Sequence, residues 1–425
     1  MLQAKDFDKI DSIVARYRPK IDVSIRIPIV EYERRYEQVH AGLREKEIDL
    51  GFFYWYREMP GDGLYLTGYN PTIERASGLI APGKRPLIIA GPESGILAEE
   101  SGLDLETYFV EEFSIPDEYY EGLAPESLVR IIREYGGENL RRIGMLTSLD
   151  IVPVKFYNVL KNEIVEGVEV VDISDILSDL RYEKSDIEFE CMRQANTIAC
   201  AAVRAMLAVA RPGLRETEVA AVGDYVVKAL GGDGVGFETI VSSGARTRTI
   251  IGPASNKIIK QGEIAQVGCS PSYEGYKGVS RRAFVMGERT ELQKQFFDIL
   301  KTGYEKAAAE LKNVVENDLP SNRIDLAPRN YFNTVTLDGE NMKQFHFFST
   351  CHGTGLTECL EPMVIHPERE DLYGENVGIM LDLGLYGHPT DAIAGACVED
   401  PYFKRGNELI KVSDLPVDVQ HLVGG

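Results

Sequence analysis

The chain has 425 residues, of which 44% are hydrophobic and 27% are charged, and its formal net charge at pH 7 is −21. Single hydrophobic cores rarely grow beyond about 300 residues, so the length predicts two globular domains. The acidic balance argues against a broad nucleic-acid surface, which needs clustered Lys and Arg, but it leaves room for a small anionic ligand held by local arginines.

The N-terminal segments alternate between helical and apolar patterns. Apolar side chains recur every three or four residues in 30–48, which predicts a helix. Four short apolar runs then predict strands at 49–56, within 61–69, at 85–91 and at 141–148. A further helix is predicted at 126–137, before the last of these strands. This alternation indicates an α/β domain with a largely parallel or mixed sheet.

A second domain is expected to begin near residues 175–185. Ser185 and Glu188 have the spacing of a capping box, so a long helix should start at 185–186. The patterns that follow predict a second helix ending at Gly231-Gly232, strands at 237–244, 263–270 and 281–287, a helix over 290–316 and strands again at 379–399. The predicted domains are therefore 1–180 and 181–425.

Two observations bear on the cellular environment. No apolar run approaches the ~20 residues that span a bilayer, and the N-terminus lacks the apolar stretch of a secretory signal. The six cysteines include no C-x-x-C pair, so neither a disulfide framework nor a zinc knuckle is expected. Both observations favour a cytoplasmic protein with no membrane partner.

Several segments, taken in order, carry a family resemblance that covers nearly the whole chain. They are GLREKEIDLGFF, LYLTGY, LRYEKSDIEFECMRQANTIACAA, RPGLRETEVAA, GFETIVSSG, QGEIAQVGCSPSYEGYKGVSRRAFVMG, CHGTGL and GIMLDLGLYG with ACVED. This series resembles the creatinase/prolidase/methionine aminopeptidase family, also called the pita-bread family. The resemblance implies an α/β protein, with a smaller creatinase-like N-terminal domain and a C-terminal α+β domain built around a curved sheet.

Enzymes of this family hold two divalent metals through Asp, Asp, His, Glu and Glu, and the resemblance locates these positions here. Gly268 and Val279 stand where the two aspartates are usual, and Ile251 lies in the loop that usually brings a substrate-binding His. Because Gly and Val offer no side-chain oxygen, a standard dimetal centre is not expected. Cys359 likewise stands where the family has a further His.

Three ligand positions remain. His352 in CHGTGL keeps the family His, Asp382 replaces the usual Glu, and Glu399 keeps the last carboxylate. The resemblance implies that these three are the catalytic residues, and that they could hold at most one divalent metal, although no cofactor is expected. A structural ion pair of Asp382 with Arg281 or Arg282 is the alternative. The neighbouring Glu358 and Glu361 are expected on a helix or loop surface.

Four arginines are candidates for substrate binding. Arg246 and Arg248 lie in the loop that carries a His in family enzymes, and Arg281 and Arg282 overlap the strand where the family has Thr-Arg. Arginine recognises carboxylates through paired hydrogen bonds, so a small anionic substrate is predicted. The alternative is that these arginines neutralise acidic residues inside the protein.

The resemblance leaves three functional hypotheses. Creatinase cleaves a carbon–nitrogen bond without metal, using a His and carboxylates. The first hypothesis is therefore a hydrolase of a small carboxylate-bearing C–N compound. His352 would act as general acid/base, and Glu399 would orient His352 or activate water. The second is a catalytically silent paralogue that binds a small molecule or a protein. The third is an Xaa-Pro peptidase.

A homodimer is also expected, because creatinase-like proteins are commonly dimers and the aromatic run around Trp55 suits an interface.

Overall fold

The computed structural model describes residues 1–359 and 361–424, which form two compact units. Residues 26–181 make up one unit, and residues 1–25 join residue 182 and its successors in the other. The domain bounds 1–180 and 181–425 stay a prediction, and the structure groups residues 1–25 with the C-terminal unit. We refer below to the N-terminal unit (26–181) and the C-terminal unit (1–25 with 182–424).

Helix α1 (Ala4–Tyr17) explains why the chain start joins the C-terminal unit. Its buried side chains, Asp6, Ile10, Val14 and Tyr17, recur every three or four residues, and the helix contacts α7 (Asp186–Val209) and α8 (Glu216–Ala229). The buried Asp6 carboxylate also pairs with Arg211 at 2.9 Å. The helix therefore completes a helical layer that residues 182–424 alone would leave open.

The N-terminal unit contains a six-stranded mixed sheet in the order β4-β3-β2-β1-β5-β6. Its strands are β1 (Leu50–Trp55), β2 (Ala76–Ile80), β3 (Leu87–Ala90), β4 (Thr107–Phe109), β5 (Arg142–Met145) and β6 (Glu169–Asp172), and its helices are α2 (Ile29–Glu45), α3 (Gly61–Thr67), α4 (Leu128–Gly136), α5 (Val154–Asn162) and α6 (Asp175–Tyr182). Apolar side chains of α4 and α5 form one buried cluster with those of β1 and β5. The mixed α/β character predicted from the sequence is confirmed.

One predicted strand of this unit is wrong. Residues 61–67 form helix α3, which ends at Gly68 in the left-handed conformation, with φ 64°. Gly63 packs so closely on Trp55 that a Cβ would lie 2.0 Å from the indole. Trp55 itself is buried, stacks on Phe53 with ring centroids 5.4 Å apart, and donates its Nε1 hydrogen to the Tyr69 carbonyl at 3.0 Å. The aromatic run is thus part of the core of its own unit.

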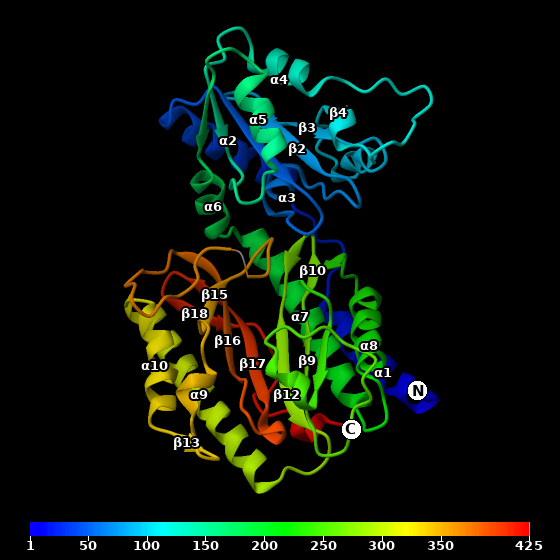
Figure 1. Cartoon of the computed structure of the whole chain (residues 1–425), viewed down its shortest axis with the longest axis vertical. Helices are drawn as coiled ribbons and strands as arrows, with labels where there is room; N and C mark the ends of the chain where they lie inside the picture. The colour runs from blue at the N-terminus through cyan, green and yellow to red at the C-terminus, as the bar shows by residue number, and fades with distance from the viewer. Residues whose placement is uncertain (360, 425) are drawn as a thin grey trace. The chain divides into compact units, whose positions relative to one another are not determined.

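The C-terminal unit is built around a seven-stranded antiparallel sheet flanked by helices. In the order β15-β16-β17-β12-β9-β8, with β18 on β17, the strands are β15 (Cys351–Gly353), β16 (Asn376–Tyr386), β17 (Gly395–Arg405), β12 (Ser280–Val285), β9 (Ile264–Cys269), β8 (Ile240–Ser243) and β18 (Glu408–Lys411). Helices α9 (Glu291–Asn317) and α10 (Asn322–Asn333) lie along one side, and α7, α8 and α1 along the other (Figure 1). This is the predicted pita-bread arrangement.

Smaller strands complete the C-terminal unit. They are β7 (Gly234–Val235), β10 (Pro271–Tyr273) and β11 (Tyr276–Lys277) in one sheet, and β13 (Thr336–Leu337) with β14 (Glu340–Asn341) in another. The predicted start of α7 is confirmed, since the Glu188 carboxylate accepts a hydrogen bond from the Ser185 backbone N–H at 2.9 Å. All six cysteines are free thiols, and Cys359 alone among them is exposed. Within residues 1–359 and 361–424, no helix is long and apolar enough to cross a membrane.

The docking of α1 can be tested with two variants of one helix. Ile10 is 2% exposed and packs inside the C-terminal unit, whereas Phe7 is 53% exposed on the same helix. We expect Ile10→Ala to reduce the free energy of unfolding by about 2–5 kcal/mol, because it leaves a cavity under α1. Phe7→Ala should change it by less than about 0.5 kcal/mol. Urea denaturation followed by far-UV circular dichroism measures both, and equal effects would contradict the packing of α1.

Candidate functional site

Four neighbouring strands of the C-terminal unit place a row of candidate residues across one face of the sheet. Gly268 on β9 lies opposite Arg281 on β12, Arg281 opposite Glu399 on β17, and Glu399 opposite Asp382 on β16. Directly opposed residues on antiparallel strands have Cβ atoms about 5 Å apart and project from the same face. Segments far apart in the sequence therefore meet at one site.

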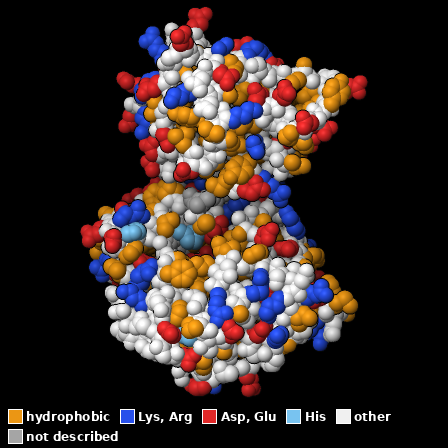
Figure 2. Space-filling view, in the orientation of Figure 1, with side chains coloured by type: hydrophobic (Ala, Val, Ile, Leu, Met, Phe, Trp, Pro, Cys, Tyr) orange, Lys and Arg blue, Asp and Glu red, His pale blue; other side chains and the backbone are white. Residues whose placement is uncertain are grey.

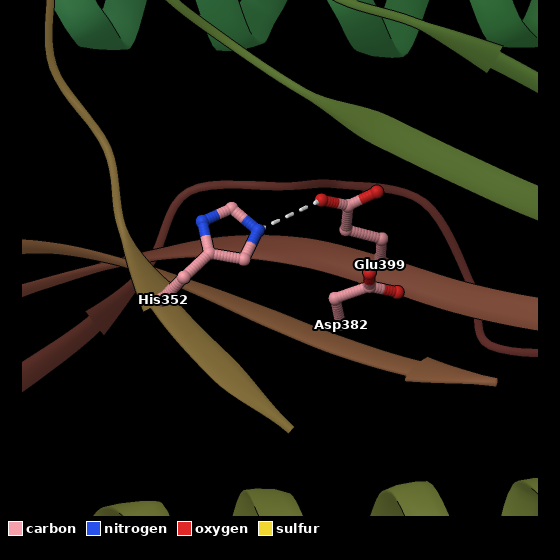
Figure 3. A group of neighbouring side chains, drawn as sticks. All are labelled: His352, Asp382 and Glu399. Carbon is pink, nitrogen blue, oxygen red and sulfur yellow. Dashed lines mark ion pairs between the residues drawn. The ribbon is translucent and has the colours of Figure 1, made fainter. Parts of the chain in front are cut away.

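His352 joins this row from β15, the strand next to β16. Its Nε2 atom lies 3.7 Å from Glu399 Oε1 and 3.7 Å from Glu358 Oε1, while its Nδ1 atom donates a hydrogen bond to the Gly353 carbonyl at 2.9 Å. The imidazole points at the Glu399 carboxylate, with Asp382 rising beside it from the neighbouring strand (Figure 3). The potential ligand atoms of His352, Asp382 and Glu399 all lie within 4.8 Å of one another.

Arg281 is the cation closest to the two carboxylates of the row. Its Nη1 atom lies 3.4 Å from Glu399 Oε2 and 3.6 Å from Asp382 Oδ2. Its Nη2 atom donates to the Tyr386 hydroxyl at 2.8 Å and to the Ile250 carbonyl. The side chain is only 3% exposed, so Arg281 is an internal counter-ion of Asp382 and Glu399.

The other three candidate arginines also have acidic partners. Arg282 pairs with Asp400 at 2.6 Å, and both side chains are 0% exposed. On the loop before β9, Arg246 pairs with Glu216 at 3.0 Å, and Arg248 pairs with Asp391 at 2.7 Å. These contacts favour the alternative that the arginines neutralise acids internally. Only Arg246 and Arg248, which are 40% and 33% exposed, offer a charge to an incoming ligand, and substrate binding by the four stays a prediction.

The sequence missed Glu358 as a member of the site. Glu358 and Glu361 were expected on a surface, but they are 9% and 2% exposed, and Glu361 accepts hydrogen bonds from the backbone N–H and hydroxyl of Thr357. The position of Glu358 beside Cys359, where the family has a His, was the available signal. Ile251 is half exposed and supplies no polar group. Burial raises the pKa of the Cys269 thiol to about 12, which leaves it unsuited to nucleophilic attack.

Charge–charge contacts decide the protonation of His352. Burial lowers the pKa of its imidazole, but the Glu399 and Glu358 carboxylates outweigh burial and raise the pKa to about 10. Burial and the Glu399 carboxylate raise the pKa of Asp382, while Arg281 and His352 offset only part of that rise. Near neutral pH the imidazole is therefore a cation that can donate a proton from Nε2.

The donor set does not fit a two-metal centre. Gly268 has no side chain, and Val279 is a fully buried apolar residue, so two of the five carboxylate and imidazole donors of the family are missing. Oxygen and nitrogen donors for a single divalent ion remain at His352, Asp382 and Glu399. However, the Arg281 guanidinium already lies against two of these three.

Comparisons with known proteins identify the family. Residues 190–403 match the family described as metallopeptidase family M24, and residues 35–182 match the creatinase/prolidase N-terminal domain. The chain belongs to metallopeptidase family M24. The matched family is one of metallopeptidases, whereas Gly268 and Val279 offer no metal-binding side chain.

Similar proteins include relatives that are named as peptidases. The chain is 27% identical over 338 residues to an Xaa-Pro dipeptidase from Pyrococcus horikoshii, covering 79% of this chain and 85% of that protein. It is 27% identical over 143 residues to a methionine aminopeptidase from Clostridium acetobutylicum, covering 32% of this chain and 56% of that protein.

Solved structures show the same fold. The P. horikoshii prolidase superposes with a TM-score of 0.72 at 20% identity, covering 92% of this chain and 100% of that one. The X-Pro aminopeptidase from Thermotoga maritima gives a TM-score of 0.74 at 20% identity, covering 91% of this chain and 99% of that one. At such identities the structures support the fold alone.

The raised pKa of His352 predicts a pH dependence of stability. The folded pKa of about 10 exceeds the unfolded value of about 6.5, so the stabilisation is complete below pH 6.5 and is lost as the pH rises to 10. Between these values the free energy of unfolding of the wild type should fall, relative to His352→Gln, by about 1.4 kcal/mol per pH unit. Urea denaturation at several pH values measures this difference.

A control variant separates this effect from general alkaline destabilisation. His366 is exposed on a loop of the same unit, so His366→Gln should run parallel to the wild type across the whole pH range. If His352→Gln also runs parallel to the wild type, His352 is not held as an imidazolium.

Proposed function

We propose that this M24 protein is a hydrolase that cleaves a carbon–nitrogen bond of a small, carboxylate-bearing substrate without a two-metal centre. The observation that carries the proposal is the position of His352 Nε2, 3.7 Å from the carboxylates of both Glu358 and Glu399. An imidazolium between two carboxylates can donate a proton, and the imidazole that remains can accept one back. At most one divalent metal, on His352, Asp382 and Glu399, is compatible with this donor set.

The proposed reaction uses three side chains in defined roles. A water molecule attacks the carbon of the C–N bond and gives a proton to Glu399 Oε1, the oxygen that faces His352. His352 donates its Nε2 proton to the departing nitrogen, so the C–N bond breaks as the C–O bond forms. Asp382 Oδ1 is buried without a hydrogen-bond partner among the described residues, so it can accept a hydrogen bond from a substrate N–H.

The carboxylate of the substrate would bind where arginines remain partly accessible. Arg246 and Arg248 lie on the 3-10 turn Gly244–Arg248, which contacts β9 and β17, the strands that carry Gly268 and Glu399. Their partial exposure allows an incoming carboxylate to compete with Glu216 and Asp391. Arg281 and Arg282 are too deeply buried for the same role.

The second candidate function is Xaa-Pro peptidase activity. Relatives named Xaa-Pro dipeptidase align with most of the chain, so kinship supports this activity better than it supports a metal-free hydrolase. The missing donors at Gly268 and Val279 oppose it, because Xaa-Pro cleavage in the M24 family relies on the dimetal centre.

One experiment separates the two candidates. Metal content of the purified protein is measured together with turnover of two panels, Xaa-Pro dipeptides and carboxylate-bearing amides, amidines and lactams. We expect fewer than two metal equivalents per chain, and turnover in the second panel that survives EDTA. His352→Gln should lower that turnover at least about 100-fold, whereas the exposed His366→Gln should leave it unchanged.

The opposite results have definite meanings. Two metal equivalents and Xaa-Pro turnover that is lost in Glu399→Ala would establish the peptidase. Binding of a panel compound without turnover would establish the silent paralogue.

The assembly and partners of the protein stay predictions. A homodimer is expected, and light scattering at micromolar concentration would exclude it by returning the monomer mass of 47.3 kDa. Lys and Arg side chains are interspersed with acidic ones on the face seen in Figure 2, which supports the view that nucleic acid is not a partner. A cytoplasmic location likewise stays a prediction.

A further inference from the structure

We propose that the guanidinium of Arg281 takes the place of a metal ion in this M24 site, and that Arg281 and Gly268 together exclude divalent metals. This deepens the proposed function, since it identifies the cation that balances Asp382 and Glu399. It does not depend on any turnover, because its tests read metal binding and thermal stability.

The first argument is steric. Gly268 lies directly opposite Arg281, and a Cβ added to Gly268 would lie 2.5 Å from Arg281 Cγ and 3.3 Å from its Cδ. The stem of Arg281 therefore fills the space that an aspartate side chain at position 268 would need. The absence of an aspartate at Gly268 and the presence of Arg281 therefore depend on each other, because the two side chains would occupy the same space.

The second argument is electrostatic. Asp382 and Glu399 are 6% and 1% exposed, and buried carboxylates require a nearby positive charge. Arg281 supplies it, at 3.6 Å from Asp382 and 3.4 Å from Glu399. A divalent ion on the same two carboxylates would meet the like charge of the guanidinium at close range.

The third argument is anchoring. On the side away from the carboxylates, Arg281 is held by hydrogen bonds to the Tyr386 hydroxyl and the Ile250 carbonyl. Both Nη atoms are engaged and only 3% of the side chain is exposed. The guanidinium therefore cannot move out into solvent and leave room for a metal ion. Removing the side chain, in contrast, leaves three donors within 4.8 Å of one another.

Calorimetric titration with MnCl2 and with ZnCl2 tests the exclusion. The wild type should show no binding that depends on His352. Arg281→Thr should bind one equivalent at least about 100-fold more tightly than the wild type, and the double variant Arg281→Thr/His352→Gln should lose that binding. Wild-type binding of either metal that His352→Gln abolishes would overturn the proposal, and so would an Arg281→Thr variant that folds but binds no more metal than the wild type.

A second measurement tests the steric argument, that the Arg281 side chain fills the space beside Gly268, in case Arg281→Thr does not fold. Gly268→Ala should lower the midpoint of thermal unfolding by about 5 °C, because the new methyl group overlaps the Arg281 stem. Gly252→Ala is the matched control, since it is also buried but its Cβ would meet no described atom closer than 3.4 Å. It should shift the midpoint by about 1 °C or less. Equal shifts for the two variants would contradict the proposal.

Discussion

The alternation of side chains across paired antiparallel strands is the constraint on which the C-terminal unit depends. Arg281 and Arg282 are adjacent in sequence, so they project from opposite faces of β12, and Glu399 and Asp400 do the same on β17. Each arginine thereby meets the acid on its own face: Arg281 meets Glu399, and Arg282 meets Asp400. The sheet can bury these charges because each of them has its partner.

The same sheet also fixes the approach of His352. The backbone N–H of Asp382 donates to the Thr350 carbonyl at 2.9 Å, two residues before His352, and the Thr350 hydroxyl donates to the buried Asp325 at 2.8 Å. Arg329 in turn pairs with Asp325 at 2.5 Å. The histidine is thus tied both to the strand that carries Asp382 and to helix α10. The proton-donor role proposed for His352 requires precise placement, which this kind of support from surrounding residues can supply.

Sequence patterns predicted the elements whose signals are local. Long periodic helices such as α7 and α9, and apolar strands such as β9, were predictable because their periodicity is visible in one segment. Helix α3 was not, since its Gly61 and Gly63 weaken the helical signal and only their close packing on Arg181 and Trp55 explains them. His352, Asp382 and Glu399 were predicted together from motif order, and the structure brings their potential ligand atoms within 4.8 Å of one another. The role of Arg281 was left open, because it depends on cross-strand register and on the direction of a long side chain.

The covalent attachment of the Arg281 charge has a consequence for the cell as well as for the fold. An ion bound from solution obeys mass action and leaves its site when its free concentration falls. A guanidinium carried on β12 cannot dissociate, and it arrives at Asp382 and Glu399 with the folding of the strand itself. The site would then reach its charge balance without a metallation step, and it would keep that balance through both metal starvation and metal excess.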